Sequence, residues 1–486
     1  MGLTMPDSST TSPESNRPAG LLVAFAWQGA GRISERFIRF GVNVVLARLL
    51  SPDDFGTFAA ILLPLVALDA ITHLACGPFI IQSRDGANRG HLSTVLLYGL
   101  LRGLVLALAV LLLAPFLAAY FERPELTPFF MVASIQPLLA GAFSPGIYLL
   151  ERDLRYVRVS MNRLIGTVVG AIVSLLIAWN DPTPWSLLVG QFVGVGMISL
   201  GSWILAPVRP TLIPDKQSWL ELRRFARGAI GTSILIMLVS QAPALLLGRL
   251  DSMAALGTFT LAYRLAELPV YLALTVIGAV LIPAYSRIQH DTSQLRSSWL
   301  QAWRVIGMFA LPISLSIAWM GDSLPGVVWG TRFIPGSGIM PLLALVGFLS
   351  ALLSVTGPLF WGVGRPGIDR SMQGIRVCTV YIAGILLVGT YAEYGLAWSL
   401  VLGLVGALGL ALPSALRITS SSLSLILKAS VPMSLVGASM FGILLLVDQT
   451  VGPDGLWRVI WGGSTGIACL LTVSLLNLGR IRASLG

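Results

Sequence analysis

The stretch LARLLSPDDFGTF at residues 46–58 returns 201 positions later as LGRLDSMAALGTF at residues 247–259. Seven of the thirteen positions match without a gap, and each copy is a short polar turn between two long apolar runs. The same register continues at two further places, where Ser83-Arg84 recurs as Ser286-Arg287 and Pro137-Leu138 recurs as Pro341-Leu342. The repeat predicts that the chain contains two related halves.

The first copy of the turn also predicts the start of a helix. Ser51 can cap the helix, Pro52 suits its first position, and Asp54 lies three residues after Ser51 to complete a capping box. The second copy keeps the serine at Ser252 but lacks the acidic residues. We therefore interpret the turn first of all as a structural element.

The composition of the chain places both halves in a membrane. Of 486 residues, 55% are apolar and 11% are charged, and the mean hydropathy is +0.82. Apolar runs of about 20 residues, enough for a helix to cross ~30 Å of hydrocarbon, recur along nearly the whole chain. These runs lack the alternation of barrel strands, and helices satisfy their own backbone hydrogen bonds in lipid. The expected fold is an all-α polytopic membrane protein.

Apolar runs between charged or turn-rich breaks predict about 14 transmembrane helices. The predicted spans are residues 24–47, 56–80, 92–120, 126–150, 157–179, 184–206, 226–249, 256–283, 299–321, 337–361, 374–392, 394–416, 425–447 and 457–478. Six spans separate the two copies of the turn, so the halves should share one orientation about an axis along the membrane normal. We expect two pseudo-symmetric six-helix bundles followed by two C-terminal helices.

These spans divide the chain into five expected segments. They are a disordered cytoplasmic tail (1–19), an N-terminal six-helix lobe (20–207), a cytoplasmic interfacial linker (208–225), a C-terminal six-helix lobe (226–417), and helices 13 and 14 with a short cytoplasmic tail (418–486).

The distribution of basic residues gives the orientation of the predicted spans. Of 32 Lys and Arg residues, 22 fall on one side, 5 on the other and 5 inside spans. The positive-inside rule then puts both termini in the cytoplasm. The net charge of +10 is mainly a topology signal, because the basic residues are spread over many short loops. We therefore expect the lipid bilayer, and no nucleic acid, as a partner.

Cofactor chemistry finds no support in the sequence. The three cysteines, Cys76, Cys378 and Cys469, lie in or beside apolar runs without disulfide or metal-ligand spacing. No paired carboxylates or nucleophile–base pattern is visible in the loops. We expect no metal, no cofactor and no enzymatic activity.

Eight charged residues remain inside the predicted spans. They are Arg32, Glu35, Arg36, Arg39, Asp69, Arg102, Arg264 and Glu267. On the first span a polar stripe recurs at steps of three and four, which places it on one helix face; its members are Gln28, Arg32, Glu35, Arg36, Arg39 and Asn43. Insertion scales assign about 2.5–3.5 kcal/mol to each charge near the bilayer centre, so this face should meet water or polar groups.

The predominance of arginine points to an anionic ligand. The guanidinium group forms two parallel charge-assisted hydrogen bonds to phosphate and stays protonated at any relevant pH. The candidate substrate-binding residues are Gln28, Arg32, Arg36, Arg39, Asn43 and Arg264. In the alternative interpretation, these charges form interhelical salt bridges that hold the lobes together.

Three longer motifs carry a resemblance to a known family. They are VVLARLLSPDDFGTFAAILLPLVAL (44–68), GPFIIQSR (77–84) and IPAYSRIQ (282–289). Together with fourteen spans in two related lobes, they resemble the bacterial polysaccharide and lipopolysaccharide flippases of the multidrug/oligosaccharidyl-lipid/polysaccharide exporter superfamily. The resemblance covers about residues 20–480 and implies a MATE-like fold.

The resemblance implies a function for the charged cavity. Members move undecaprenyl-pyrophosphate-linked oligosaccharides from the cytoplasmic to the periplasmic leaflet of the bacterial inner membrane, by alternating access driven by ion gradients. It implies a proton or sodium gradient as driving force, and other polysaccharide assembly proteins as partners. The candidate ion-coupling residues are Asp69, Glu267 and Glu35.

Two other functions remain open at this point. A drug or cation antiporter has the same fold, but its cavity should favour acids, whereas the in-span charges here are five arginines against three acids. A membrane-embedded polysaccharide polymerase or ligase should keep catalytic residues in a large outside loop, whereas every outside loop here is short.

Overall fold

Helices form all the regular structure in the residues that the computed structural model describes, which are 18–72, 76–83, 88–208, 215–226, 230–335, 338–451 and 455–485. Ten helices in these ranges are long and apolar enough to cross a membrane, and one bent pair would make eleven. The predicted all-α polytopic membrane fold is confirmed. The count of about 14 spans stays a prediction.

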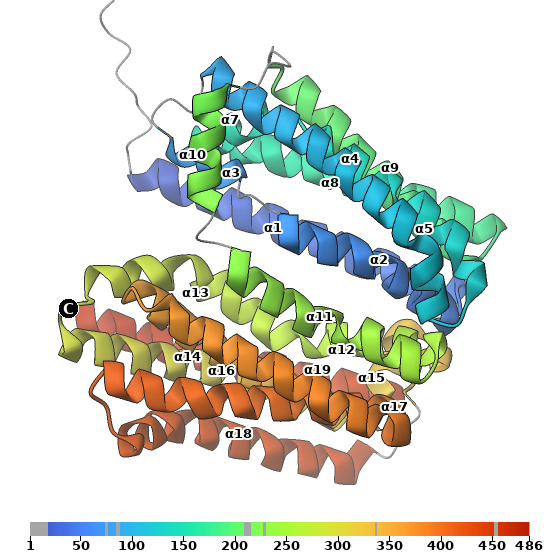
Figure 1. The fold of residues 1–486 in the computed structure, drawn as a ribbon. Helices are drawn as coiled ribbons and strands as arrows, with labels where there is room; N and C mark the ends of the chain where they lie inside the picture. Colours follow the sequence, from blue (N-terminus) through green and yellow to red (C-terminus); the bar gives the residue numbers. More distant parts are fainter. Residues whose placement is uncertain are drawn as a thin grey trace, which may run out of the picture.

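The helices gather in two bundles, drawn one above the other in Figure 1. The first, here called the N-lobe, contains α1 (Pro18–Leu49), α2 (Pro52–Thr72), α3 (Cys76–Gln82), α4 (Arg89–Tyr120), η2 (Pro124–Leu126), α5 (Thr127–Ala133), α6 (Ile135–Gly141), α7 (Gly146–Arg152), α8 (Tyr156–Asn180) and α9 (Pro184–Leu205). The short helix α10 (Lys216–Ala226) leads to the second bundle.

The second bundle, here called the C-lobe, contains the remaining helices. They are α11 (Ile230–Leu250), α12 (Met253–Ala266), α13 (Leu268–Arg287), α14 (Thr292–Met320), α15 (Ser323–Trp329), η3 (Thr331–Phe333), α16 (Met340–Gly362), α17 (Pro366–Ile418), α18 (Leu423–Val451) and α19 (Gly455–Leu485). The predicted tail 1–19 lies outside the described residues, except for its last two residues, which begin α1.

The 53-residue helix α17 consists of two antiparallel helices. Its helical conformation breaks at Ala392, where φ is 47° and ψ is −129°. A β-carbon built on Gly403 would lie 2.5 Å from Val380 Cγ2, so residues on either side of the break pack against each other. The break falls between the predicted spans 374–392 and 394–416.

Both copies of the repeated turn begin a helix, as the sequence predicts. In the first copy, the backbone N–H and hydroxyl of Ser51 donate to Asp54 Oδ2 at 2.8 and 2.6 Å, and the Asp54 N–H donates back to Ser51 Oγ at 3.3 Å. In the second copy, Ser252 Oγ accepts from the N–H of Ala255 at 3.1 Å. The capping box therefore starts α2, and a single serine cap starts α12.

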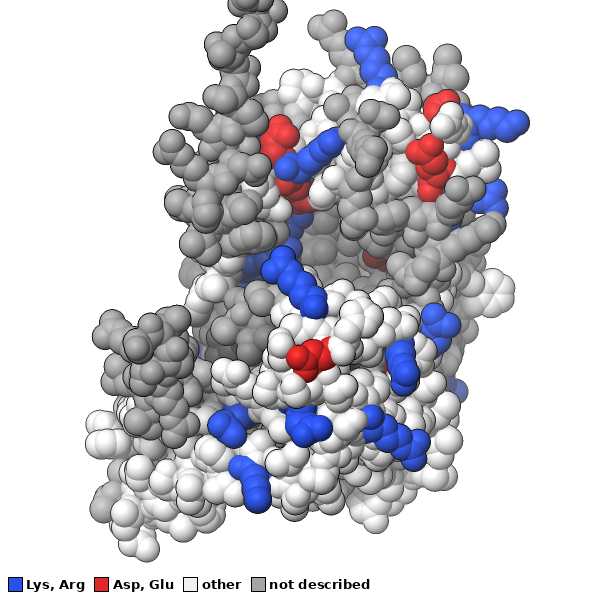
Figure 2. Space-filling model, turned by 90° about the vertical axis from the view of Figure 1, so that its left-hand side faces the viewer, with Lys and Arg blue, Asp and Glu red and all other residues white. Residues whose placement is uncertain are grey.

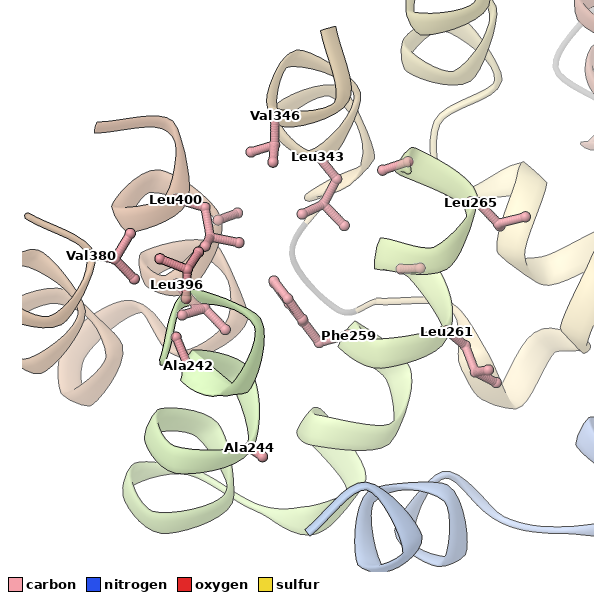
Figure 3. Packing of buried hydrophobic residues seen from close by; sticks show 14 of the residues in the cluster. Ala242, Ala244, Phe259, Leu261, Leu265, Leu343, Val346, Val380, Leu396 and Leu400 are labelled. Atoms are coloured by element: carbon pink, nitrogen blue, oxygen red, sulfur yellow. The ribbon is translucent and has the colours of Figure 1, made fainter. Parts of the chain in front are cut away.

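The last residue of the second copy anchors α12 in the core of the C-lobe. Phe259 is fully buried and points from α12 into a cluster that includes Leu343 of α16 and Leu396 and Leu400 of α17 (Figure 3). Close packing of such a side chain stabilises contacts between membrane helices through van der Waals attraction. The start of α12 is thus fixed to its own lobe.

The helix α10, which begins in the predicted linker 208–225 and ends one residue after it, packs against the N-lobe. Leu222 is fully buried in a small cluster with Phe79 and Leu92. Glu221 Oε2 lies 3.1 Å from the Nε2 atom of His91, which is buried on α4. The linker is therefore a strap held to the N-lobe by apolar and polar contacts.

The strap is expected to loosen in acid. The hydrogen bond to His91 lowers the pKa of Glu221 below its ordinary value. A carboxyl pKa that is lower in the folded protein stabilises the docked strap above the ordinary carboxyl pKa, and this stabilisation is lost as the pH falls. A spin label at the exposed Leu220 should therefore become more mobile below about pH 4. Glu221→Gln should weaken this response, and an unchanged response would contradict the prediction.

Candidate functional site

The polar stripe of α1 lies in the middle of the molecule and reaches both lobes. Arg32, Arg36 and Arg39 are exposed, whereas Glu35 and Asn43 are half-buried. Arg39 donates to Glu35 Oε1 at 2.9 Å and lies 3.5 Å from Thr167 Oγ1 of α8. The side chain of Gln28 lies outside the described residues.

Arg36 connects α1 to the C-lobe. Its guanidinium carbon lies 2.8 Å from the ring centroid of Tyr271 on α13. Glu267 and Glu35 are the carboxylates that act on its charge, and Arg39 is the neighbouring cation. A cation over an aromatic face is attracted by the ring electrons. The stripe therefore meets the second lobe through an arginine.

On the C-lobe side, charges surround Glu267 at the junction of α12 and α13. Its main charged neighbours are Arg264, Arg36 and Arg376. Arg264 is exposed although Leu265 and Ala266, which follow it, are buried. Arg264 is therefore an exposed residue next to a packed part of α12.

We call the group Arg36, Arg39, Arg264, Arg376, Glu35 and Glu267 the central cluster. Four guanidinium groups face two carboxylates, so the cluster carries two net positive charges. Arg39 also acts on Arg264 across the lobes. Internal ion pairs cannot neutralise this group, so it offers guanidinium groups to a phosphate or another anion.

Arg376 also belongs to this site, although it was not among the candidate residues predicted from the sequence. It lies ten residues after Pro366, inside the first half of α17, and its Nε atom is buried without a hydrogen-bond partner among the described residues. Tyr263 and Glu267 are its nearest electrostatic partners. The predicted span 374–392 already contains position 376, but close to its start, where a basic residue resembles a loop charge.

Next to the cluster, Arg32 lines a groove between α1 and α8. The groove has an empty volume of about 300 Å³ and is also lined by Glu35, Glu151, Tyr156 and Arg163. Arg163 and Glu151 form a long ion pair of 3.5 Å. The groove extends the polar surface of the central cluster along the N-lobe.

Asp69 lies apart from the central cluster. Its carboxylate forms an ion pair with Arg102 of α4. The same arginine donates to Thr72 Oγ1 at 2.9 Å and to the carbonyl of Asp69 at 3.3 Å. The charge of Arg102 is therefore compensated within the N-lobe, which agrees with a structural role for this ion pair.

The two copies of the repeated turn meet at one end of the molecule. A β-carbon built on Gly56 of α2 would lie 1.7 Å from the carbonyl oxygen of Met253, and one built on Gly257 of α12 would lie 1.9 Å from that of Pro52. Only glycine permits so close an approach of two backbones. We call this end the closed end.

Aromatic and polar contacts seal the closed end further. Phe40 and Phe55 of the N-lobe pack edge-on against Trp329 and Phe333, with ring centroids 5.0 and 5.4 Å apart. Arg48 also donates to the carbonyl of Val327 at 2.7 Å. Trp329 and Phe333 are fully buried. The lobes are therefore in direct contact at this end.

The opposite end, which carries the starts of α4, α8 and α17, is hollowed between the lobes (Figure 2). Lys and Arg side chains lie on both sides of the hollow. The central cluster thus lies between a sealed end and an open one, which is the arrangement expected of one state of an alternating-access transporter.

Solved structures share this architecture. The lipid II flippase MurJ, in an inward closed conformation, matches with a TM-score of 0.74 at 15% identity, covering 94% of this chain and 99% of MurJ. A multidrug resistance MATE family transporter of the MOP superfamily, in an inward-facing conformation, matches with a TM-score of 0.59 at 14% identity, covering 81% and 98%. The predicted MATE-like fold is confirmed.

Sequence relatives narrow the assignment from fold to family. The succinoglycan biosynthesis transport protein ExoT of Rhizobium meliloti (strain 1021) is 24% identical over 347 residues, which cover 70% of this chain and 68% of ExoT. The family described as polysaccharide biosynthesis protein matches residues 45–337, which is more than half of the chain. The chain belongs to the polysaccharide biosynthesis protein family.

Proposed function

We propose that this protein is a flippase that moves a lipid-linked oligosaccharide across a bacterial inner membrane for surface polysaccharide synthesis. The observation that carries the proposal is the central cluster, whose net positive charge lies between the lobes with one end open. The family, the named transport role of ExoT and the fold of the lipid II flippase support it. The protein acts as a transporter and not as an enzyme.

The chemistry of the cluster suggests which part of the substrate binds there. A pyrophosphate and its sugars cannot cross hydrocarbon unaided, whereas a prenyl tail can stay in the lipid. Arg36, Arg39 and Arg264 would bind the pyrophosphate of an undecaprenyl-linked oligosaccharide, or acidic sugars, through charge-assisted hydrogen bonds. Arg32 and the groove beside it, together with Gln28 and Asn43, would contact the sugars.

The open end faces the cytoplasm in this proposal, because the basic loop residues gather there. Both termini are then cytoplasmic and the closed end is periplasmic. Substrate enters from the cytoplasmic leaflet, and separation of the lobes at the closed end releases it to the periplasmic leaflet. A substrate biases this exchange only if its affinity differs between the two states.

The remaining acids are the candidates for coupling to a proton or sodium gradient. Glu35 and Glu267 lie in the central cluster, where a change in their charge would alter the binding of an anion. Asp69 is the weakest candidate, because Arg102 already compensates its charge. Assembly with other polysaccharide proteins remains part of the proposal.

A gene replacement tests the function. In a bacterial host whose own oligosaccharide flippase is deleted, this protein should restore surface polysaccharide, whereas an empty vector should not. The same host, made deficient in drug exporters, should gain no resistance to cationic dyes, because a net positive cavity disfavours cations. Dye resistance without polysaccharide would replace the proposal with drug export.

A further inference from the structure

A buried carboxyl group lies at the closed end, outside the central cluster. Glu393 follows directly after the break of α17 at Ala392 and is only 7% exposed. Its Oε1 atom forms a hydrogen bond with Thr258 Oγ1 of α12, which is itself 8% exposed. Neither residue was singled out from the sequence, because an acid in a short turn resembles an ordinary solvated loop charge.

Within the part of the chain that the structure describes, the charges around Glu393 do not compensate an ionised carboxylate. The charged groups that act on it are two further acids, Asp251 at the end of α11 and Asp322 before α15. The helix α16 carries no charged residue, and Arg249 of α11 is paired with Glu122 of the N-lobe. A buried carboxylate without a cation is costly, and such a group takes up a proton instead.

The hydrogen bonds around Thr258 also fit a neutral acid. The hydroxyl oxygen lies within reach of Glu393 Oε1 and 3.0 Å from each of the carbonyl oxygens of Ala254 and Ala255. A hydroxyl carries one proton, so it cannot donate to a carboxylate and to a carbonyl at once. If Glu393 is protonated, it donates to Thr258 Oγ1 and the hydroxyl donates to a carbonyl.

The position of this pair connects it to the contact between the lobes. Thr258 follows Gly257, whose α-carbon lies against the carbonyl of Pro52 in the N-lobe. The bond from Glu393 therefore holds the start of α12 at the place where the closed end is sealed. Separation of the lobes there would let water reach the carboxyl group.

We propose that Glu393 is a proton-binding site, loaded from the closed end, whose bound proton favours the closed contact between the lobes. One proton moves from water to the Glu393 carboxylate when this end closes, and returns when it opens. The ratio of closed to open protein then rises by up to about tenfold for each unit by which the pH falls. The role of this proton in driving transport rests on the proposed flippase function, whereas its binding does not.

Infrared spectroscopy of the full-length protein in lipid vesicles tests the binding directly. At pH 5 the wild type should show the C=O band of a neutral carboxylic acid, and Glu393→Gln should remove the intensity of one such group. Glu125→Gln is the matched control, because Glu125 is an exposed acid at the same end. A spectrum of Glu393→Gln identical to that of the wild type would overturn the proposal.

A distance measurement tests the link to closure. Spin labels at Asp181→Cys and Thr331→Cys, which are exposed and lie on different lobes, should move apart as the pH rises in the wild type and in Glu125→Gln. Glu393→Gln should stay closed at every pH, because its amide mimics the neutral acid. Equal pH responses in Glu393→Gln and the wild type would overturn the link.

Thr258→Val provides a second variant should the glutamine protein fold poorly. Loss of the hydroxyl removes the acceptor for the protonated carboxyl group and the bond that holds the start of α12, so the opening transition should move to lower pH, and an unmoved transition would count against the proposal. Neither experiment contains a lipid-linked sugar. A failed gene replacement would therefore contradict the flippase function and not the proton site. Failure of the spectroscopic tests would contradict the proton site and not the flippase function.

Discussion

Arg264→Ala and Arg36→Ala should each lower the restoration of surface polysaccharide by about 10- to 100-fold while the protein still inserts in the membrane. A hydrogen bond to a charged group contributes about 1.5–3 kcal/mol, and each 1.4 kcal/mol is a tenfold change in affinity. Arg264 is an exposed member of the central cluster, and Arg36 reaches both lobes. The measurement is polysaccharide on the cell surface at equal amounts of membrane protein.

Two control variants separate substrate binding from packing. Lys428→Ala removes an exposed charge on α18, away from the central cluster, and should leave the activity unchanged. Arg36→Lys keeps the charge over the Tyr271 ring but loses the planar fork that binds phosphate. Full activity of Arg36→Lys would show that this arginine serves the contact between the lobes. Full activity of both alanine variants as well would show that the cluster does not bind substrate.

Gly257→Ala should abolish transport while each lobe stays folded. The new β-carbon would lie 1.9 Å from the carbonyl oxygen of Pro52, and both partners are backbone atoms that cannot rotate away. The lobes must therefore separate at the closed end, whereas the packing of Phe259 within the C-lobe is untouched. A transporter that cannot close this end cannot alternate between its two states.

Labelling from the periplasmic side checks this result. A cysteine at Asn43, in a background without native cysteines, should react slowly with an impermeant maleimide in the parent protein and much faster with Gly257→Ala. Gly389→Ala is the matched control, because a β-carbon there meets no atom within 4 Å and helix propensity favours alanine by about 1 kcal/mol. Slow labelling and normal transport in Gly257→Ala would show that the contact is not a gate.

Several features of the site could be predicted from local sequence pattern. Steps of three and four placed Arg32, Arg36 and Arg39 on one face of α1, and these side chains are all exposed in the folded protein. The capping box at Ser51 and Asp54 formed as expected, because it needs only four consecutive residues. Such features depend on the geometry of a single helix, which periodicity determines.

Pairings between helices could not be predicted in this way. Asp69 binds Arg102, and Arg36 lies over Tyr271 of the other lobe. Glu393 reaches Thr258 across 135 positions of sequence. Arg376 was taken for a loop charge because it lies near the start of the predicted span 374–392, whereas α17 begins at Pro366, ten residues before it.

The sequence alone determined that this protein is a helical membrane protein of two related halves, because apolar run length, repeated turns and charge spacing act within single segments. Tertiary structure alone decided that Gly56 and Gly257 seal one end and that the central arginines keep a net positive charge. The physical reason is that periodicity sets the direction of a side chain around its own helix axis. Periodicity does not set the rotation of neighbouring helices or the distance between them. These two quantities determine which partner each charged side chain meets.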